Sequence, residues 1–147
     1  MVSEDRYSLL ILFLSCLVVK STSSIYYIED VDSLRFALSV YDKFDLLKLQ
    51  PHFPGYSVFC FFANCIYVLT GSLAYSFSII GGVSTFLIIY FSLITFNLKI
   101  NSKEGLFAIL LIMFNPMIWL LGNRYMPDLM GLSIFVASFY LIAHQDS

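Results

Sequence analysis

No aspartate, glutamate, lysine or arginine occurs between residues 49 and 98 of this chain. Ordinary soluble domains are about 25% charged, so a stretch of this length normally carries about a dozen charged side chains. Over the whole chain only 12% of the residues are charged and 59% are hydrophobic, with a mean hydropathy of +0.84. A fold exposed to water on all sides could not cover itself with so little charge. We therefore expect lipid to be its main solvent.

Four apolar stretches approach the length of a membrane-spanning helix, which needs about 20 mainly apolar residues. They cover residues 7–28, 75–96, 105–121 and 129–144. The first contains Lys20, which we expect either to snorkel or to face protein. This stretch lacks the basic leader of a signal peptide, so we expect it to be retained. Pro116 lies inside the third stretch and is expected to kink that helix.

These stretches predict an all-α membrane protein, with residues 1–147 forming a single domain of about four transmembrane helices. Residues 29–74 form the first loop, which also gathers the charge of the chain. Its charged residues are Glu29, Asp30, Asp32, Arg35, Asp42, Lys43, Asp45 and Lys48. Within the loop an amphipathic juxtamembrane helix is predicted by the helical spacing of Leu34, Ala37, Leu38 and Tyr41.

The apolar run 56–70 has two interpretations, because it is short for a span. It is either a second juxtamembrane helix at the interface or a further crossing, and the choice sets the side of every later loop. If it crosses, Lys99 and Lys103 lie outside and Arg124 lies inside. If it does not cross, those sides are exchanged. The second arrangement agrees better with the excess of Lys and Arg found in cytoplasmic loops, and it places Asp32 and Asp128 on the same, outer side.

Several of these polar residues also have simple structural explanations. Asp30 or Asp32 could be the N-cap of the juxtamembrane helix. Arg35 could be only a surface partner of Asp32 one turn away. His52 could be an ordinary turn residue, and Asp128 could stabilise the start of the last helix through the helix dipole.

The order of three short motifs along the chain says more about function than the spacing of the individual residues does. "DSLRFA" begins at Asp32, "PHFPGY" begins at Pro51, and "RYMPD" ends at Asp128. This order resembles the N-terminal module of the GT-C glycosyltransferases, membrane enzymes that use polyprenyl-phosphate sugars and include protein O-mannosyltransferases and the lipid A aminoarabinose transferase. "DSLRFA" is similar to the acid-x-x-Arg-aromatic-Ala segment of their first outer loop, and "RYMPD" to the acidic segment of the second. The resemblance covers about residues 7–143.

The resemblance implies sugar transfer from a polyprenyl-phosphate donor to a hydroxyl of a lipid, glycan or protein acceptor, with inversion. Asp32 would be the general base, with Asp30 the next candidate for that role. Asp128, the other catalytic residue, would orient the acceptor, hold Arg35 or share a metal ion. Arg35 and His52 would bind the donor phosphate. His52 would also suit a divalent metal ion, should the enzyme use one. The family also carries juxtamembrane helices in this loop, which favours the arrangement in which residues 56–70 do not cross.

Family members have more spans than this chain, so the resemblance implies that the chain is one part of a larger enzyme. We expect the isolated chain to lack a complete groove for the lipid donor and to show no transfer alone. The implied location is a multi-pass integral membrane protein, in the plasma membrane if the source is prokaryotic, with its site on the outer face. Besides the donor and acceptor, membrane lipid is the expected partner.

Other function classes fit the sequence less well. The net charge is -2 and no basic stripe occurs, which argues against nucleic acid as a partner. A channel or transporter would need charged groups along its spans, and Lys20 is almost alone there. The alternative that remains is a non-enzymatic membrane subunit or scaffold, whose loop charges bind a partner or lipid headgroups.

The charge distribution makes a prediction about topology. We expect reporter fusions at Asn101 and Asn123 to give opposite sides of the membrane, with Asn101 cytoplasmic, because Lys99 and Lys103 then lie inside. An outside signal at Asn101 would separate Asp32 from Asp128 and exclude a site that contains both.

Overall fold

The computed structural model describes residues 2–144, which are α-helical apart from short connections and one 3₁₀ turn. The helices are α1 (Val2–Thr22), α2 (Val31–Tyr41), η1 (Leu46–Lys48), α3 (Ser57–Thr70), α4 (Leu73–Thr95), α5 (Lys103–Met113), α6 (Pro116–Leu121) and α7 (Asp128–Ala143). No strand occurs in this part of the chain. The prediction of an all-α fold is therefore confirmed.

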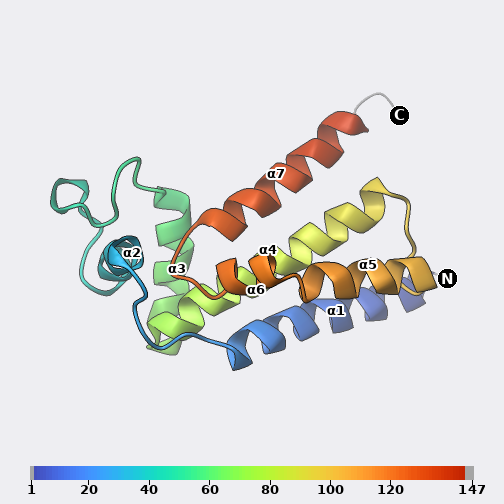
Figure 1. Ribbon diagram of the computed structural model, residues 1–147, viewed down its shortest axis with the longest axis horizontal. Coiled ribbons are helices and arrows are strands. Elements are labelled where there is room, and N and C mark those ends of the chain that lie inside the picture. Colours follow the sequence, from blue (N-terminus) through green and yellow to red (C-terminus); the bar gives the residue numbers. More distant parts are fainter. Residues whose placement is uncertain (1, 145–147) are drawn as a thin grey trace.

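The helix α4 is the centre of the structure, and α1, α3, α5 and α7 all pack against it (Figure 1). One apolar core joins α2, α3 and α4 around Phe36, Phe59 and Phe77. A second core joins α1, α4 and α5 around Cys16 and Ile89. The helices α2 and α3 and the chain that connects them lie at one end of the molecule. The start of α1 and the loop before α5 lie at the other end, where the Ser8 hydroxyl donates to Asn101 Oδ1 at 3.0 Å.

Among the described residues, α4 is the one helix long and apolar enough to cross a membrane, with 23 residues and a mean hydropathy of 2.1 in its most apolar window. This is consistent with a membrane protein. The helices α3 and α7 are apolar but shorter, with 14 and 16 residues. The helix α1 has 21 residues but includes Glu4, Asp5, Arg6 and Lys20.

The helix predicted over residues 7–28 ends earlier than expected, because α1 begins at Val2 and ends at Thr22 rather than at residue 28. Hydroxyl groups share the last backbone carbonyls of α1: Thr22 Oγ1 donates to Val18 O at 2.9 Å, and Ser23 Oγ donates at 2.8 Å to Val19 O, which the Ser23 N–H also bonds at 3.3 Å. Serine and threonine compete in this way with the helical ladder. The chain then continues without helix to the start of α2 at Val31.

The predicted third span is divided into two helices. α5 ends at Met113, and α6 begins with Pro116 as its first residue. Proline has no N–H to donate to Ile112 O, and the Asn115 N–H bonds that carbonyl at 3.2 Å instead. The Asn115 side chain then caps α6 by accepting from the Met117 N–H at 2.9 Å. The expected kink is therefore a complete break with a new helix start.

Lys20 faces protein, which was one of its two predicted positions. Its side chain is 1% exposed, and its ammonium donates to Ile118 O at 2.8 Å and Trp119 O at 3.1 Å. It also lies 5.2 Å from the centre of the Trp119 ring. A cation is stabilised at the C-terminal carbonyls of a helix and over an indole face. Lys20 thus joins α1 to the end of α6.

The amphipathic helix predicted in the loop is present as α2, and Ala37 is the one residue of the predicting apolar set that is fully buried. The buried residues are Ser33, Phe36, Ala37, Ser39 and Val40, whereas Leu34 and Tyr41 are exposed. Phe36 fills the space beside α3, with its ring centre 5.6 Å from that of Phe59. The aromatic packing of Phe36 therefore decides the rotation of α2, and the more hydrophobic Leu34 lies on the outer surface.

Glycine permits a very close backbone contact between Gly81 of α4 and Gly122, which follows α6. A Cβ atom on Gly81 would lie 1.7 Å from Gly122 O, which no small adjustment can accommodate. The neighbouring Gly82 faces the backbone of α1 at Leu17. Glycine is required at position 81 because the backbone carbonyl of Gly122 occupies the place of a side chain.

We predict that Gly81→Ala destabilises the protein by about 1–3 kcal/mol, the usual cost of overpacking, and that it displaces the residues after Gly122. Gly131→Ala in α7 is the matched control, since a Cβ there meets nothing within 4 Å. Alanine favours a helix by up to about 1 kcal/mol over glycine, so the control should be neutral or stabilising. Thermal unfolding in detergent micelles measures both. Equal melting temperatures for the two variants would contradict the packing argument.

Candidate functional site

The site is built on the first turn of α2. Asp30 is the N-cap: its backbone is extended, and its Oδ1 accepts a hydrogen bond from the Ser33 N–H at 2.7 Å. The alternative in which Asp32 caps this helix is therefore wrong. Asp32 lies two residues later, in the first turn, and its side chain is free to face the surface.

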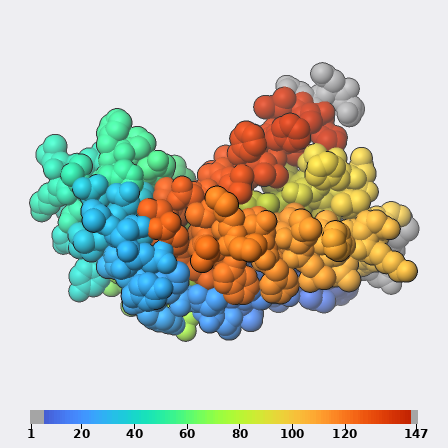
Figure 2. All heavy atoms as spheres, in the orientation of Figure 1, coloured from blue at the N-terminus to red at the C-terminus, as the bar shows by residue number. Residues whose placement is uncertain are grey.

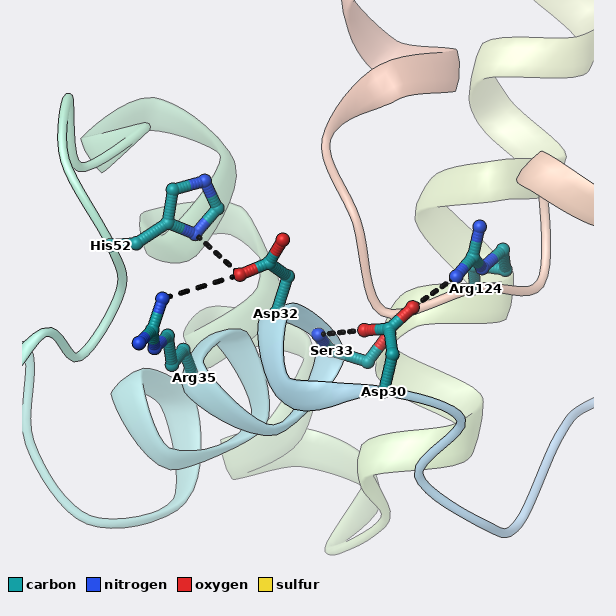
Figure 3. A network of polar contacts seen from close by, with 6 residues as sticks. All are labelled: Asp30, Asp32, Ser33, Arg35, His52 and Arg124. Atoms are coloured by element: carbon teal, nitrogen blue, oxygen red, sulfur yellow. Dashed lines mark hydrogen bonds and ion pairs between the residues drawn. The ribbon is translucent and has the colours of Figure 1, made fainter.

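Three of the predicted site residues come together around Asp32. The Asp32 Oδ1 atom lies 3.4 Å from Arg35 Nη1 and 3.7 Å from His52 Nδ1 (Figure 3). Figure 3 shows the Asp32 carboxylate directed toward these two partners, while the Asp30 carboxylate is directed the other way. The Asp32 side chain is 47% exposed. A carboxylate, a guanidinium and an imidazole thus share one open surface at the end of the bundle.

Aromatic packing holds His52 in this position. Its ring centre lies 5.2 Å from that of Phe36 and 5.9 Å from that of Tyr56. A turn in which the Gly55 N–H bonds His52 O at 3.0 Å returns the chain toward α3. The Nδ1 atom is buried and has no hydrogen-bond partner among the described residues. His52 is therefore not a turn residue with both ring nitrogens satisfied, because Nδ1 faces Asp32 at 3.7 Å without forming a hydrogen bond.

Asp128 belongs to a neighbouring cleft rather than to this cluster. It is the first residue of α7 and is exposed. In the described part of the chain it forms no hydrogen bond or ion pair, so Arg35 is held by Asp32 and not by Asp128. The cleft has a volume of about 650 Å³ and lies between α3 and α7, where Figure 2 shows the surface hollowed. Its lining residues include Tyr56, Ser57, Phe59, Asp128, Met130 and Ile134.

Tyr56 connects the cleft to the Asp32 cluster. Its side chain lines the cleft, and the same ring lies 5.7 Å from Phe36 and 5.9 Å from His52, measured between ring centres. The walls of the cleft are mainly apolar, with Asp128 the one charged residue in its lining. A molecule in the cleft would therefore reach the surface beside His52.

The sequence interpretation missed a second cluster on the other side of Asp30. Arg124 Nε donates to Glu29 Oε2 at 2.6 Å, and Arg124 Nη2 donates to Asp30 Oδ2. Asp30 thus binds the start of α2 with one oxygen and Arg124 with the other (Figure 3). The sequence did contain a signal for this contact. Arg124 is opposite in charge to Glu29 and Asp30, and the two loops that contain them were expected on the same side of the membrane.

The neighbours of Arg124 bind the same part of the chain. Asn123 Nδ2 donates to Ser23 O at 2.9 Å, and the Tyr125 hydroxyl donates to Ile25 O at 2.7 Å. We call residues 122–127 the outer segment and residues 23–30 the linker. Three consecutive side chains of the outer segment therefore hold the linker that leads into α2.

Hydrogen bonds and charge change the acidity of two groups in this region. The Ser33 N–H lowers the pKa of the Asp30 carboxyl below its ordinary value, and the Arg124 guanidinium lowers it further. Burial raises the pKa of the Tyr125 hydroxyl. Asp30 is thus held as an anion and Tyr125 as a neutral donor at neutral pH.

The described residues contain no group of three or more His, Cys, Asp or Glu side chains placed to hold a metal ion. The Asp32–His52 pair supplies two possible ligands. Comparison with known proteins finds no match: no protein-family model, no curated protein and no solved structure is similar to this chain. The site must therefore be interpreted from its own chemistry.

The lowered pKa of Asp30 predicts a pH dependence of stability. A carboxyl whose folded pKa is lowered stabilises the fold above its unfolded pKa of about 3.9, and loses that contribution as the pH falls through the folded value. Asp30→Asn keeps the cap but cannot titrate. We expect the melting temperature of the wild type to exceed that of Asp30→Asn at pH 6 and the difference to shrink steadily as the pH falls below about 3.9. A difference that does not change with pH would contradict this assignment.

Proposed function

We propose that the chain is an integral-membrane glycosyltransferase of the GT-C type, or part of one, which transfers a sugar from a polyprenyl-phosphate donor to an acceptor hydroxyl. The observation that carries the proposal is the cluster of Asp32, Arg35 and His52, with Oδ1 of Asp32 at 3.4 Å from the guanidinium and 3.7 Å from the imidazole. These are the three groups that the reaction requires: a base, a phosphate-binding cation and a further hydrogen-bond donor.

A membrane setting is supported by the outer surfaces of the bundle. Large apolar side chains are exposed along α5 and α7, among them Phe107 at 68% and Phe135 at 68%. Soluble monomers rarely expose continuous apolar surfaces of this kind. In the proposed arrangement α1, α4, the α5–α6 pair and α7 make four passes, with α2 and α3 at the outer interface. The Arg124–Asp30 contact supports this, because it joins the first and second outer loops directly.

In the proposed reaction the acceptor oxygen forms a bond to the anomeric carbon of the donor sugar. The bond between that carbon and the phosphate oxygen breaks, and the polyprenyl phosphate leaves with the bonding electrons. Asp32 takes the acceptor proton. Phosphate is a good leaving group that needs positive charge more than a proton, which Arg35 supplies through its fork of donors. Direct displacement inverts the configuration at the anomeric carbon.

His52 and Asp128 have supporting roles in this proposal. His52 donates a further bond to the phosphate and is held for it by Phe36 and Tyr56. Asp128 orients the acceptor from the neighbouring cleft, whose lining includes Tyr56. The apolar walls of this cleft suit a lipid-linked molecule, whose headgroup would then lie beside Arg35.

The second candidate is a non-enzymatic membrane subunit. The exposed apolar faces of α5 and α7 favour it, since partner helices could cover the same surfaces. The two candidates differ in what they require of Asp32. A subunit needs Asp32 at most for a weak surface ion pair, whereas the enzyme needs it for the chemical step.

Asp32→Asn is the test, assayed in membranes that contain the complete enzyme with a short-chain polyprenyl-phosphate sugar. General-base catalysis is typically worth about 10²–10⁴-fold, so transfer should fall by orders of magnitude. Because Asp30 and not Asp32 caps α2, the melting temperature should hardly change. Arg35→Lys keeps the charge but loses the fork, and should weaken donor binding and rate together.

Asp42→Asn is the control at the other end of α2, where Asp42 is the C-cap residue and makes no ion pair among the described residues. It should leave the rate unchanged. An unimpaired rate in Asp32→Asn would move the base to Asp30 or Asp128. Absence of both donor binding and transfer in the wild type would favour the subunit.

A further inference from the structure

We infer that Arg124 is a positioning residue, which fixes the direction of the Asp32 carboxylate by holding Asp30, the cap of the same helical turn. The inference rests on the proposed function only for its catalytic consequence. The mechanical part, that the outer segment controls the first turn of α2, rests on contacts alone.

The first step is the double role of Asp30. Its Oδ1 accepts from the Ser33 N–H at 2.7 Å, and its Oδ2 accepts from Arg124 Nη2. The Leu34 N–H also bonds the backbone carbonyl of Asp30 at 3.0 Å. The backbone N–H groups of Ser33 and Leu34, both at the start of α2, thus depend on Asp30. The guanidinium fixes the orientation of the carboxylate that caps them.

The second step is the anchoring of Arg124 itself. Its neighbour Tyr125 is 5% exposed and stacks on Phe77 of α4, with ring centres 4.5 Å apart. Gly122 lies against Gly81 of the same helix. The outer segment is therefore attached to the central helix on both sides of Arg124. It offers a rigid support, whereas the linker before α2 has no helical structure of its own.

The third step is the form of the guanidinium. Arg124 uses Nε for Glu29 and Nη2 for Asp30, so two adjacent N–H groups on one edge of the planar group each bind a different acid. Lysine presents one compact ammonium and cannot reproduce this geometry. Asp32 makes no contact with Arg124, and its direction depends on the turn that Asp30 begins (Figure 3).

Hydrogen–deuterium exchange on the complete protein in lipid nanodiscs tests the mechanical part. Arg124→Gln should accelerate exchange in residues 31–35 by roughly tenfold or more, because a charge-assisted contact is lost. Exchange within α4 should not change. Glu29→Gln is the matched control, since it removes an acid partner of Arg124 that does not cap α2, and its effect on residues 31–35 should be clearly smaller.

Combining Asp30→Asn with Arg124→Gln should add little to Arg124→Gln alone, because both variants break the same contact. Three results would overturn the inference: unchanged exchange in residues 31–35 of Arg124→Gln, equal acceleration in α4, or an effect of Glu29→Gln as large as that of Arg124→Gln. The second result would show a general loss of stability instead of a local one.

The catalytic consequence has a separate measurement. Arg124→Gln should lower kcat by roughly tenfold or more while KM for the donor changes little, since Arg35 remains in place to bind phosphate. Asp42→Asn should match the wild type. A normal kcat in Arg124→Gln, with an active wild type, would overturn the positioning role. If the wild type transfers no sugar, the proposed function fails, and the exchange experiment still decides whether Arg124 controls α2.

Discussion

The buried ammonium of Lys20 makes the interaction on which the end of the molecule that contains α2 depends. It donates to Ile118 O and Trp119 O and, in the described part of the chain, has no carboxylate partner. A buried cation is costly unless nearly all of its donors are satisfied, so the end of α6 must remain beside α1. This contact places Gly122 against Gly81, and Gly122 begins the outer segment that holds the linker and α2. These are tertiary contacts, and the helix propensity of the local residues contributes little to them.

The sequence was sufficient for the helical class and for the positions of α4 and α7, because long apolar runs have few alternative folds. It was also sufficient to group Asp32, Arg35 and His52 in one loop. It was not sufficient for the face by which α2 packs on the bundle: the spacing of Leu34, Ala37, Leu38 and Tyr41 identified an amphipathic helix, but Phe36 packs inward while Leu34 and Tyr41 are exposed. Apolar spacing identifies an inward face only where the outside is water. In a chain with this composition both faces of a helix can be apolar, and the shape of the neighbouring side chains decides.

The end of α1 and the partners of Arg124 were missed for a related reason. Residues 23–28 contain enough apolar side chains to extend a helix, but the backbone carbonyls of Ser23 and Ile25 are bound by Asn123 and Tyr125 from about a hundred residues away. Such tertiary hydrogen bonds override local preference. Asp30 and Asp32 could not be separated as caps by spacing alone, because either residue can precede the same apolar pattern. The bond from Ser33 N–H to Asp30 separates them.

The two acids of the first turn of α2 therefore have opposite roles, and energetics explain why. Asp30 joins a network of a helix cap, Arg124 and Glu29, and a network of charge-assisted bonds stabilises more than a single pair. Asp32 faces Arg35 at 3.4 Å with nearly half of its side chain exposed, and such surface pairs contribute about 0–1 kcal/mol. The stability of the fold gives little reason for a carboxylate, a guanidinium and an imidazole to meet there. The proposed transfer reaction would give such a reason, because a weak pair opens readily and each of its members would then exchange its partner for a phosphate or hydroxyl group of a substrate.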